Sequence, residues 1–281
     1  MDFVLLSGHI EQMFERISGP QHKLAIQVPR VPEGSRVYAI GDIHGRLDLL
    51  QKLHLLIVED AKDFAGVRKA LVYLGDYIDR GPQSRETVEH LIGDPLPDFE
   101  RFYLMGNHER ALLDFLSDSR SGRAWMAYGG GATLYSYGIA IEGPRMEAET
   151  LERAQEKFRA CLPPRHLEFY QRLSLMHSEG DYLFVHAGVR PGVPLARQQE
   201  KDVLWIRGDF LVSEESLDKV IVHGHTIIPV PEVKKNRIGI DTGAFASGKL
   251  TCVALEGETA RFLDTEKGRI GRPGAFQGGN S

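Results

Sequence analysis

Short apolar runs, each ending in a polar turn that contains glycine, dominate the first half of the chain. Runs of this length are typical of strands that are buried on both faces of a sheet. Apolar positions between the runs repeat at helical spacing, and successive turns lie roughly 30 residues apart, about the length of one βαβ unit. We therefore predict a central βαβαβ motif whose parallel strands end at one edge of the sheet. The predicted strands are 37–40, 70–74 and 102–105, and the predicted helices cover 47–57 and 88–92.

A helical insertion and a second set of strands follow this motif. Residues 119–172 lack the strand pattern and show helical spacing at 145–160 and 164–173. Short strand patterns after the insertion, separated by turn residues, indicate a second sheet of mixed or antiparallel strands. We therefore predict an α/β fold in which two sheets form a β-sandwich flanked by helices. The later predicted strands are 182–186, 219–223, 237–241, 250–255 and 259–263.

The predicted domain is a single unit over residues 36–264. Residues 1–35 form an N-terminal extension, in which 9–18 predict a short amphipathic helix. The segment 265–281 is rich in Gly, Arg and Pro and lacks apolar periodicity, so we expect a flexible tail. No basic leader is present at the N-terminus, and no apolar run reaches the roughly 18 residues that span a bilayer. We therefore expect a cytoplasmic protein without a membrane partner.

Composition excludes several classes of protein. The 281 residues include 34 Lys and Arg against 39 Asp and Glu, which gives a formal charge of -5. Proteins that bind nucleic acid are usually basic, so we expect no nucleic-acid partner. The two cysteines, Cys161 and Cys252, lie far apart and form no Cys-x-x-Cys motif. This excludes a disulfide scaffold and a cysteine zinc site as the organising feature.

Side chains of the types that bind metals recur at the ends of the predicted strands. Ligands of open α/β sheets bind outside the carboxyl ends of the strands, where these side chains lie. A mixture of Asp, Asn and His favours Mn, Fe or Zn over Ca. Six or more ligands suffice for two ions if one carboxylate bridges them. One such motif alone is most simply a turn, but five in this order indicate a site. The candidates are Asp42, His44, Asp76, Asn107, His108, His186, His223 and His225.

The order of these motifs resembles the calcineurin-like metallophosphoesterases. The chain contains Gly-Asp-Ile-His-Gly, Gly-Asp-Tyr-Ile-Asp-Arg-Gly, Gly-Asn-His-Glu, His-Ala-Gly and Gly-His-Thr in turn. More narrowly, the chain resembles the phosphoprotein phosphatases in their bacterial and phage-type branch. Those enzymes also lack the last histidine of Gly-His-x-His, where this chain has Ile227. The resemblance covers roughly residues 36–256 and implies a metallophosphoesterase-type sandwich.

The resemblance also implies roles for individual residues. Two divalent or trivalent metal ions per chain are implied, with Mn expected in vitro and Fe or Zn as alternatives. Asp42 and His44 would bind the first ion, Asp76 would bridge both, and Asn107, His186 and His225 would complete the second. His108 would be the general acid and Asp79 its hydrogen-bond partner, while Arg80, Arg207 and Asn107 would hold the phosphate. The role of His223 stays open.

These roles imply a phosphomonoesterase that dephosphorylates phosphoserine or phosphothreonine in proteins by direct attack of a metal-bridging hydroxide. Phosphotyrosine remains open as a substrate, as do the physiological substrate and the oligomeric state. The alternative is a symmetrical diadenosine tetraphosphate hydrolase, although those enzymes generally lack an acid at the position of Asp79. A catalytically inactive binding module on the same fold is a third interpretation, but all six implied ligand positions are filled.

The insertion carries aromatic side chains that bear on substrate choice. Loops and insertions on a rigid scaffold usually determine specificity. Trp125, Tyr128, Tyr135 and Tyr137 could line a cleft for a phosphorylated peptide or an aromatic ring. The simpler interpretation is that each of them packs in the insertion's own small core.

Overall fold

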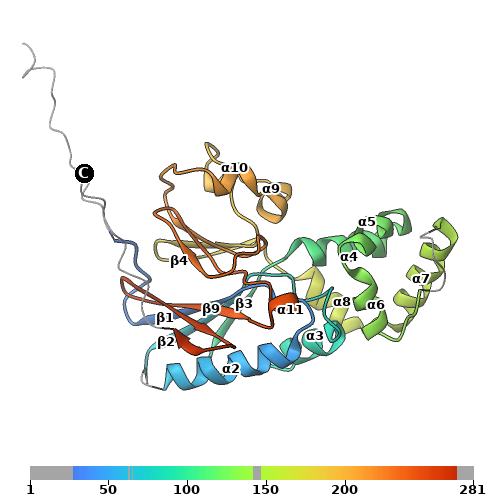
Figure 1. Ribbon diagram of the computed structural model, residues 1–281, viewed down its shortest axis with the longest axis horizontal. Coiled ribbons are helices and arrows are strands. Elements are labelled where there is room, and N and C mark those ends of the chain that lie inside the picture. The colour runs from blue at the N-terminus through green and yellow to red at the C-terminus, as the bar shows by residue number, and fades with distance from the viewer. Residues whose placement is uncertain (1–27, 63, 65, 142–146, 271–281) are drawn as a thin grey trace, which may run out of the picture. The chain divides into compact units, whose positions relative to one another are not determined.

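A computed structural model describes residues 28–270 except 63, 65 and 142–146. Its first sheet has the strand order β11-β10-β9-β1-β2-β3. The predicted βαβαβ motif is confirmed, because β1, β2 and β3 pair in parallel with helices between them. The antiparallel strands β9 and β10 extend the sheet beyond β1 (Figure 1). The bounds are β1 (Ser35–Ile40), β2 (Arg68–Tyr73), β3 (Glu100–Tyr103), β9 (Thr251–Glu256) and β10 (Thr259–Asp264).

Alternate residues of the central strands enter two different cores. Tyr38 and Ile40 pack with Leu50 and Leu53 of α2 (Leu47–Ala61) and with residues of α3 (Ser84–Ile92). Val37 and Ala39 point to the opposite face, where they pack against the second sheet. A strand that is buried on both faces needs apolar residues at successive positions, which explains the continuous apolar runs.

The second sheet is mixed, as predicted, and has the strand order β4-β5-β6-β8-β7. The prediction also assigned 250–255 and 259–263 to this sheet, but they form β9 and β10 of the first sheet, because β9 pairs with β1. Its strands β5, β6 and β8 are parallel, while β4 and β7 run antiparallel at the two edges. The helices α9 (Glu200–Trp205) and α10 (Gly208–Leu211) lie on the side of this sheet away from the first (Figure 1). The bounds are β4 (Met176–Glu179), β5 (Tyr182–Val185), β6 (Val220–His223), β7 (Glu232–Val233) and β8 (Arg237–Gly239).

The helical insertion begins earlier than expected, directly after β3. Gly106 precedes the first helix, and the Glu109 carboxylate accepts a hydrogen bond from the Gly106 N–H, which caps the helix that starts at Asn107. The two ends of the insertion meet at the sheet edge, since the Met105 N–H donates to Ser174 O at 2.8 Å. A parallel bridge between Leu104 and Ser174 adjoins this bond. The elements are α4 (Asn107–Ser117), η1 (Ser119–Ser121), α5 (Gly122–Ala127), α6 (Gly130–Ser136), α7 (Ala148–Cys161) and α8 (Pro164–Gln171).

The start of the expected flexible tail is a paired strand. Residues 268–270 form β11 (Gly268–Ile270), which pairs antiparallel with β10. The Asp264 carboxylate accepts hydrogen bonds from the N–H groups of Glu266 and Lys267, and this stabilises the tight turn between the two strands. The expected helix at 9–18 and the rest of the tail lie outside the described residues. Among the helices that the structure does describe, none has the length and apolar character that a membrane crossing requires.

Candidate metal centre and active site

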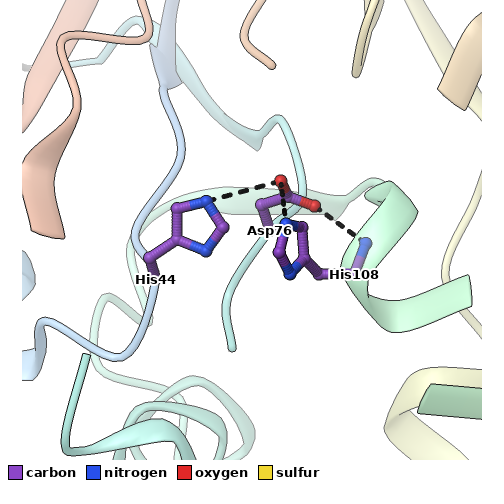
Figure 2. Close-up of side chains that lie close together, drawn as sticks. All are labelled: His44, Asp76 and His108. Atoms are coloured by element: carbon purple, nitrogen blue, oxygen red, sulfur yellow. Dashed lines mark hydrogen bonds and ion pairs between the residues drawn. The ribbon is translucent and has the colours of Figure 1, made fainter. Parts of the chain in front are cut away.

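The predicted ligands of the first sheet meet where its parallel strands end. His44 follows β1, Asp76 follows β2, and His108 lies at the start of α4, after β3. Figure 2 shows both imidazoles turned toward the Asp76 carboxylate. Asp76 Oδ2 is 3.6 Å from His44 Nε2 and 3.7 Å from His108 Nε2. All three side chains are buried, and their ligand atoms lie close enough together to hold one ion.

The second sheet contributes a second group around the same carboxylate. His186 follows β5 and His225 lies just beyond β6. His186 Nε2 is 3.5 Å from Asp76 Oδ1, 2.9 Å from Asn107 Oδ1 and 3.2 Å from His225 Nδ1. Asp76, His186 and His225 could together hold a metal ion. The two oxygens of Asp76 therefore face two different groups of donors, one from each sheet.

The structure differs from the sequence-based assignment in how it groups Asp42 and His108. His108, and not Asp42, shares a cluster with His44 and Asp76. The Asp42 carboxylate is buried beside them and accepts hydrogen bonds from the His225 N–H at 3.0 and 3.2 Å. Asp42 thus lies in the centre, between the two sheets, and its role as a ligand stays a prediction.

Backbone strain is concentrated at this centre. Among the described residues, six non-glycine residues have positive φ, and five of them are predicted site residues. Side chains in the left-handed region cost free energy, and such residues persist where the surrounding structure fixes them. The five are His44, Asp76, Asp79, Arg80 and His225, with φ between 48° and 71°. The strand-end turns are therefore held in the conformations that aim these side chains inward.

Two glycines allow the close approach of these turns. A Cβ at Gly106 would lie 2.1 Å from Asp76 Oδ1, and a Cβ at Gly224 would lie 2.0 Å from Asp42 Oδ1. Glu109 reinforces the first approach, because its buried carboxylate accepts hydrogen bonds from the N–H groups of Asp76, Tyr77 and Gly106. One carboxylate thereby joins the turns that follow β2 and β3.

Hydrogen bonds orient the imidazoles of His44 and His186 for metal binding. The Nδ1–H of His44 donates to Ile78 O at 2.8 Å, and the Nδ1–H of His186 donates to Leu74 O at 2.9 Å. These bonds leave each Nε2 lone pair facing Asp76. Burial lowers the pKa of His44 to about 3, which keeps the ring neutral as metal coordination requires. The Nε2 of His225 is buried without a hydrogen-bond partner.

Buried negative charge also fits a cation. Burial, followed by the charges of Asp241 and Asp76, raises the pKa of Asp42 well above its usual range. Asp241 is itself buried and follows β8 in Ile240-Asp241-Thr242-Gly243. Asp241 was not among the predicted ligands, although it follows a strand end as they do. Three buried carboxylates and neutral imidazoles are a donor set that a pair of metal ions would satisfy.

His108 is held by Asp79 as the resemblance implied. The His108 Nδ1 is 2.6 Å from Asp79 Oδ2, and both side chains are buried. Burial lowers the pKa of His108, but the Asp76 charge and the Asp79 hydrogen bond outweigh it, so the pKa is raised. Asp79 in turn accepts hydrogen bonds from two residues of the insertion, Trp125 and Thr133. Sequence analysis missed this link.

The two predicted phosphate-binding arginines both reach the centre. Arg80 Nη2 is 3.4 Å from His108 Nε2, and its guanidinium lies over the Phe245 ring at 4.6 Å. Arg207 comes from the other side and donates through Nη1 to His225 O and to Thr226 Oγ1, each at 3.1 Å.

His223 is the one candidate histidine that lies outside both clusters among the described residues. It is buried, its Nε2 has no hydrogen-bond partner, and its ring packs against Phe210. The four aromatic candidates of the insertion differ in burial. Trp125 and Tyr137 are buried, whereas Tyr128 is exposed and its ring centroid is 6.1 Å from that of His108. Two of the four aromatics, Trp125 and Tyr137, therefore pack in the insertion's core, whereas Tyr128 and Tyr135 are exposed.

Comparisons with known proteins agree with this geometry. The family model described as calcineurin-like phosphoesterase matches residues 35–252. Serine/threonine-protein phosphatase 2 of Salmonella typhimurium is 30% identical over 227 residues, which cover 76% of this chain and 90% of that protein. The asymmetrical bis(5'-nucleosyl)-tetraphosphatase PrpE of Bacillus thuringiensis is 26% identical over 234 residues, covering 76% of this chain and 88% of that protein.

Solved structures share the fold. A crystal structure of a putative diadenosine tetraphosphatase superposes with a TM-score of 0.55 at 19% identity, covering 84% of this chain and 96% of the other. A mutant of a cold-active protein tyrosine phosphatase superposes with a TM-score of 0.53 at 16% identity, covering 88% of this chain and 85% of the other. With the family match over most of the domain and the clustered His and Asp side chains at its strand ends, this chain belongs to the calcineurin-like phosphoesterase family.

Proposed function

We propose that the protein is a dimetal phosphomonoesterase that removes phosphoryl groups from serine or threonine side chains of proteins. The observation that carries this proposal is the pair of His108 and Asp79, joined at 2.6 Å inside the centre. An alkoxide is a poor leaving group and needs a proton as it departs, which a positioned imidazolium can supply. The phosphate leaving group of a nucleoside polyphosphate is far less basic and depends less on such an acid.

The residues that would hold the two ions are those at the strand ends: Asp42, His44, Asp76, Asn107, His186 and His225. Asp76 would serve both ions, because its two oxygens face separate donor groups. When bound, the ions would neutralise charge on the phosphoryl oxygens and supply an activated water as nucleophile. We propose Mn for assays in vitro, with Fe or Zn as alternatives, since Asp, Asn and His donors suit all three.

Around this centre, the chain's own groups would bind the phosphate and move the proton. The Arg80 guanidinium lies beside His108, the Arg207 guanidinium lies beside His225, and Asn107 Oδ1 is 2.9 Å from His186 Nε2. Planar guanidinium groups can donate two parallel hydrogen bonds to phosphate oxygens. His108 would hold its proton on Nε2 for the leaving oxygen, while Asp79 fixes the ring through Nδ1. Tyr128 and Trp205 are exposed, with their ring centroids 5.4 Å apart, and they offer apolar surface for the flanking peptide.

The test compares leaving groups. The His108→Asn variant should lower kcat on a phosphoserine peptide by about 10²–10⁴ and lower it much less on p-nitrophenyl phosphate, whose leaving group needs little protonation. His223→Asn is the matched control, because His223 is buried nearby but lies outside both clusters. Equal losses on the two substrates in His108→Asn would contradict the role of general acid.

A nucleotide hydrolase is the second candidate, supported by the likeness to PrpE. That relative is named as asymmetrical, whereas the motifs of this chain resemble the symmetrical class. Turnover of diadenosine tetraphosphate, measured beside phosphoserine, phosphothreonine and phosphotyrosine peptides, separates the two candidates. If the dinucleotide is cleaved orders of magnitude faster than every peptide, the protein phosphatase proposal fails.

A further inference from the structure

The helical insertion contacts the centre through the Asp79 carboxylate. Trp125 of α5 donates from Nε1 to Asp79 Oδ2 at 2.8 Å, and Thr133 of α6 donates from Oγ1 to Asp79 Oδ1 at 2.5 Å. The Asp79 N–H returns a bond to Thr133 Oγ1 at 2.9 Å. With His108 on Oδ2, the carboxylate accepts three side-chain hydrogen bonds, and two of the donors come from the insertion.

This network is fully buried, so its hydrogen bonds have no competition from water. Asp79, Trp125 and Thr133 have no measurable exposure, and His108 is 1% exposed. The carboxylate therefore cannot rotate without leaving a buried donor unpaired, which is costly in such surroundings. Since Asp79 sets the orientation of the His108 ring, the two insertion residues restrict that ring as well.

The insertion is itself built to fix these two donors. A Cβ at Gly130 would lie 2.6 Å from the Trp125 ring, so α6 packs directly on the indole. Gly129 O accepts a hydrogen bond from the Arg80 N–H at 3.3 Å, which joins the loop before α6 to the turn that carries Asp79. The close packing places Trp125 and Thr133 on opposite oxygens of one carboxylate.

We propose that Trp125 and Thr133 are positioning residues that act through Asp79 on His108, so that the insertion determines how well phosphate esters of alcohols are cleaved relative to aryl phosphates. The inference rests on the proposed role of His108 as general acid. Orientation of the acid matters when the leaving oxygen needs a proton in the transition state, as in phosphoserine. Turnover of an aryl phosphate with an acidic phenol should not depend on the orientation of His108.

The experiment uses the metal-loaded full-length protein with two substrates, a phosphoserine peptide and p-nitrophenyl phosphate. Trp125→Phe keeps the ring packing and removes the Nε1–H, while Thr133→Val keeps the shape and removes the hydroxyl. Each should lower kcat on the peptide by about 10-fold or more and change kcat on p-nitrophenyl phosphate by less than about 3-fold, a part of the full general-acid effect. Thr133→Ser should restore peptide turnover.

Tyr137→Phe is the matched control. It removes a buried hydroxyl from the same small core, where that hydroxyl contacts His166 and Tyr170 but not Asp79. We expect it to leave the ratio of the two kcat values unchanged. The proton resonance of the His108–Asp79 hydrogen bond, recorded on zinc-loaded protein, should shift in Trp125→Phe and Thr133→Val but not in Tyr137→Phe.

Two results would overturn the inference. Suppose that Trp125→Phe and Thr133→Val lower kcat on the two substrates equally, or leave both kcat values unchanged, while His108→Asn lowers kcat mainly on the peptide. The positioning role then fails and the proposed function stands. If His108→Asn itself lowers kcat on both substrates equally, the general-acid role fails and the inference fails with it. Should one variant fail to fold, the other and the Thr133→Ser rescue still decide the outcome.

Discussion

At the scale of single residues, Asp76 unites the two halves of the centre. Its oxygens face imidazoles from both sheets, at 3.5 to 3.7 Å. Its backbone has a φ of 51°, a conformation that both asparagine and aspartate tolerate. The Asp76→Asn substitution therefore removes charge while preserving the turn.

We expect Asp76→Asn to lose bound metal and activity together. The loss of activity should exceed the roughly 10–100-fold that is typical of residues outside the ligand set, because both ions lose their shared anionic donor. Metal content of the purified variant, measured beside kcat, checks this. A variant that retains two ions per chain would show that Asp76 does not bridge.

Residues that follow predicted strands could be identified from sequence, because parallel strand ends must converge. Asp42, His44, Asp76, Asn107, His186 and His225 all have this signal. The bonds from Trp125 and Thr133 to Asp79 had no such signal, since they join residues 46 and 54 positions apart through the packing of helices. Trp125 instead showed the pattern of an ordinary core aromatic.

At the scale of elements, α6 shows how two neighbouring glycines can have opposite roles. A Cβ at Gly130 would overlap the Trp125 ring, whereas a Cβ at Gly131 meets nothing within 4 Å. Gly131 has no positive φ that would require glycine. Alanine has less conformational freedom than glycine in the unfolded chain, so it loses less entropy when the helix forms.

Gly131→Ala should therefore raise the free energy of unfolding by up to about 0.5–1 kcal/mol. Gly130→Ala should lower it by about 1–3 kcal/mol, because the methyl group must displace the indole or the helix. Urea denaturation of the two variants beside the wild type measures both changes. Equal effects in the two variants would contradict the packing of α6 on Trp125.

The boundaries of elements were harder to predict than their existence. The insertion begins at α4 and not near residue 119, because the Glu109 carboxylate caps the Gly106 N–H and the strand-end turn continues directly into a helix. The strand β11 escaped prediction because a composition rich in Gly, Arg and Pro resembles a tail, while its pairing depends on the turn at Asp264.

At the scale of the whole molecule, an ion pair joins the two sheets far from the metal centre. Arg68 of β2 donates to both carboxylate oxygens of Glu179 in β4, at 2.9 and 3.0 Å. Burial raises the pKa of Glu179, but the bonds from Arg68 and His177 outweigh it and hold the pKa below the ordinary value of 4.5. The folded state therefore favours the ionised carboxylate.

A lowered pKa means that this contribution to stability is complete above pH 4.5 and is lost as the pH falls through the folded-state value. Glu179→Gln should lower the free energy of unfolding at neutral pH by about 1 kcal/mol, discounted because Arg68 is partly exposed. The difference from the wild type should shrink below pH 4.5.

Urea denaturation across this pH range measures the effect. Glu100→Gln is the control, since Glu100 pairs with the same arginine but is 54% exposed. A difference between wild type and Glu179→Gln that stays constant with pH would show that the charge of Glu179 contributes nothing.

The closed base of the insertion has a consequence for how this chain can change. Because Met105 and Ser174 are hydrogen-bonded neighbours, the 68 residues between them leave and rejoin the sheet at one point. An insertion of this kind can be exchanged between proteins without moving the strands that flank it. The exchange must keep Asn107, His108 and Glu109 at the start of the insertion, and it must also keep Trp125 and Thr133. A graft that lacks the last two donors would inherit the fold and the metal ligands but leave Asp79 without its supports. Phe158 of α7 stacks on the Trp125 ring, so a change in that helix should alter the chemistry when it moves the ring.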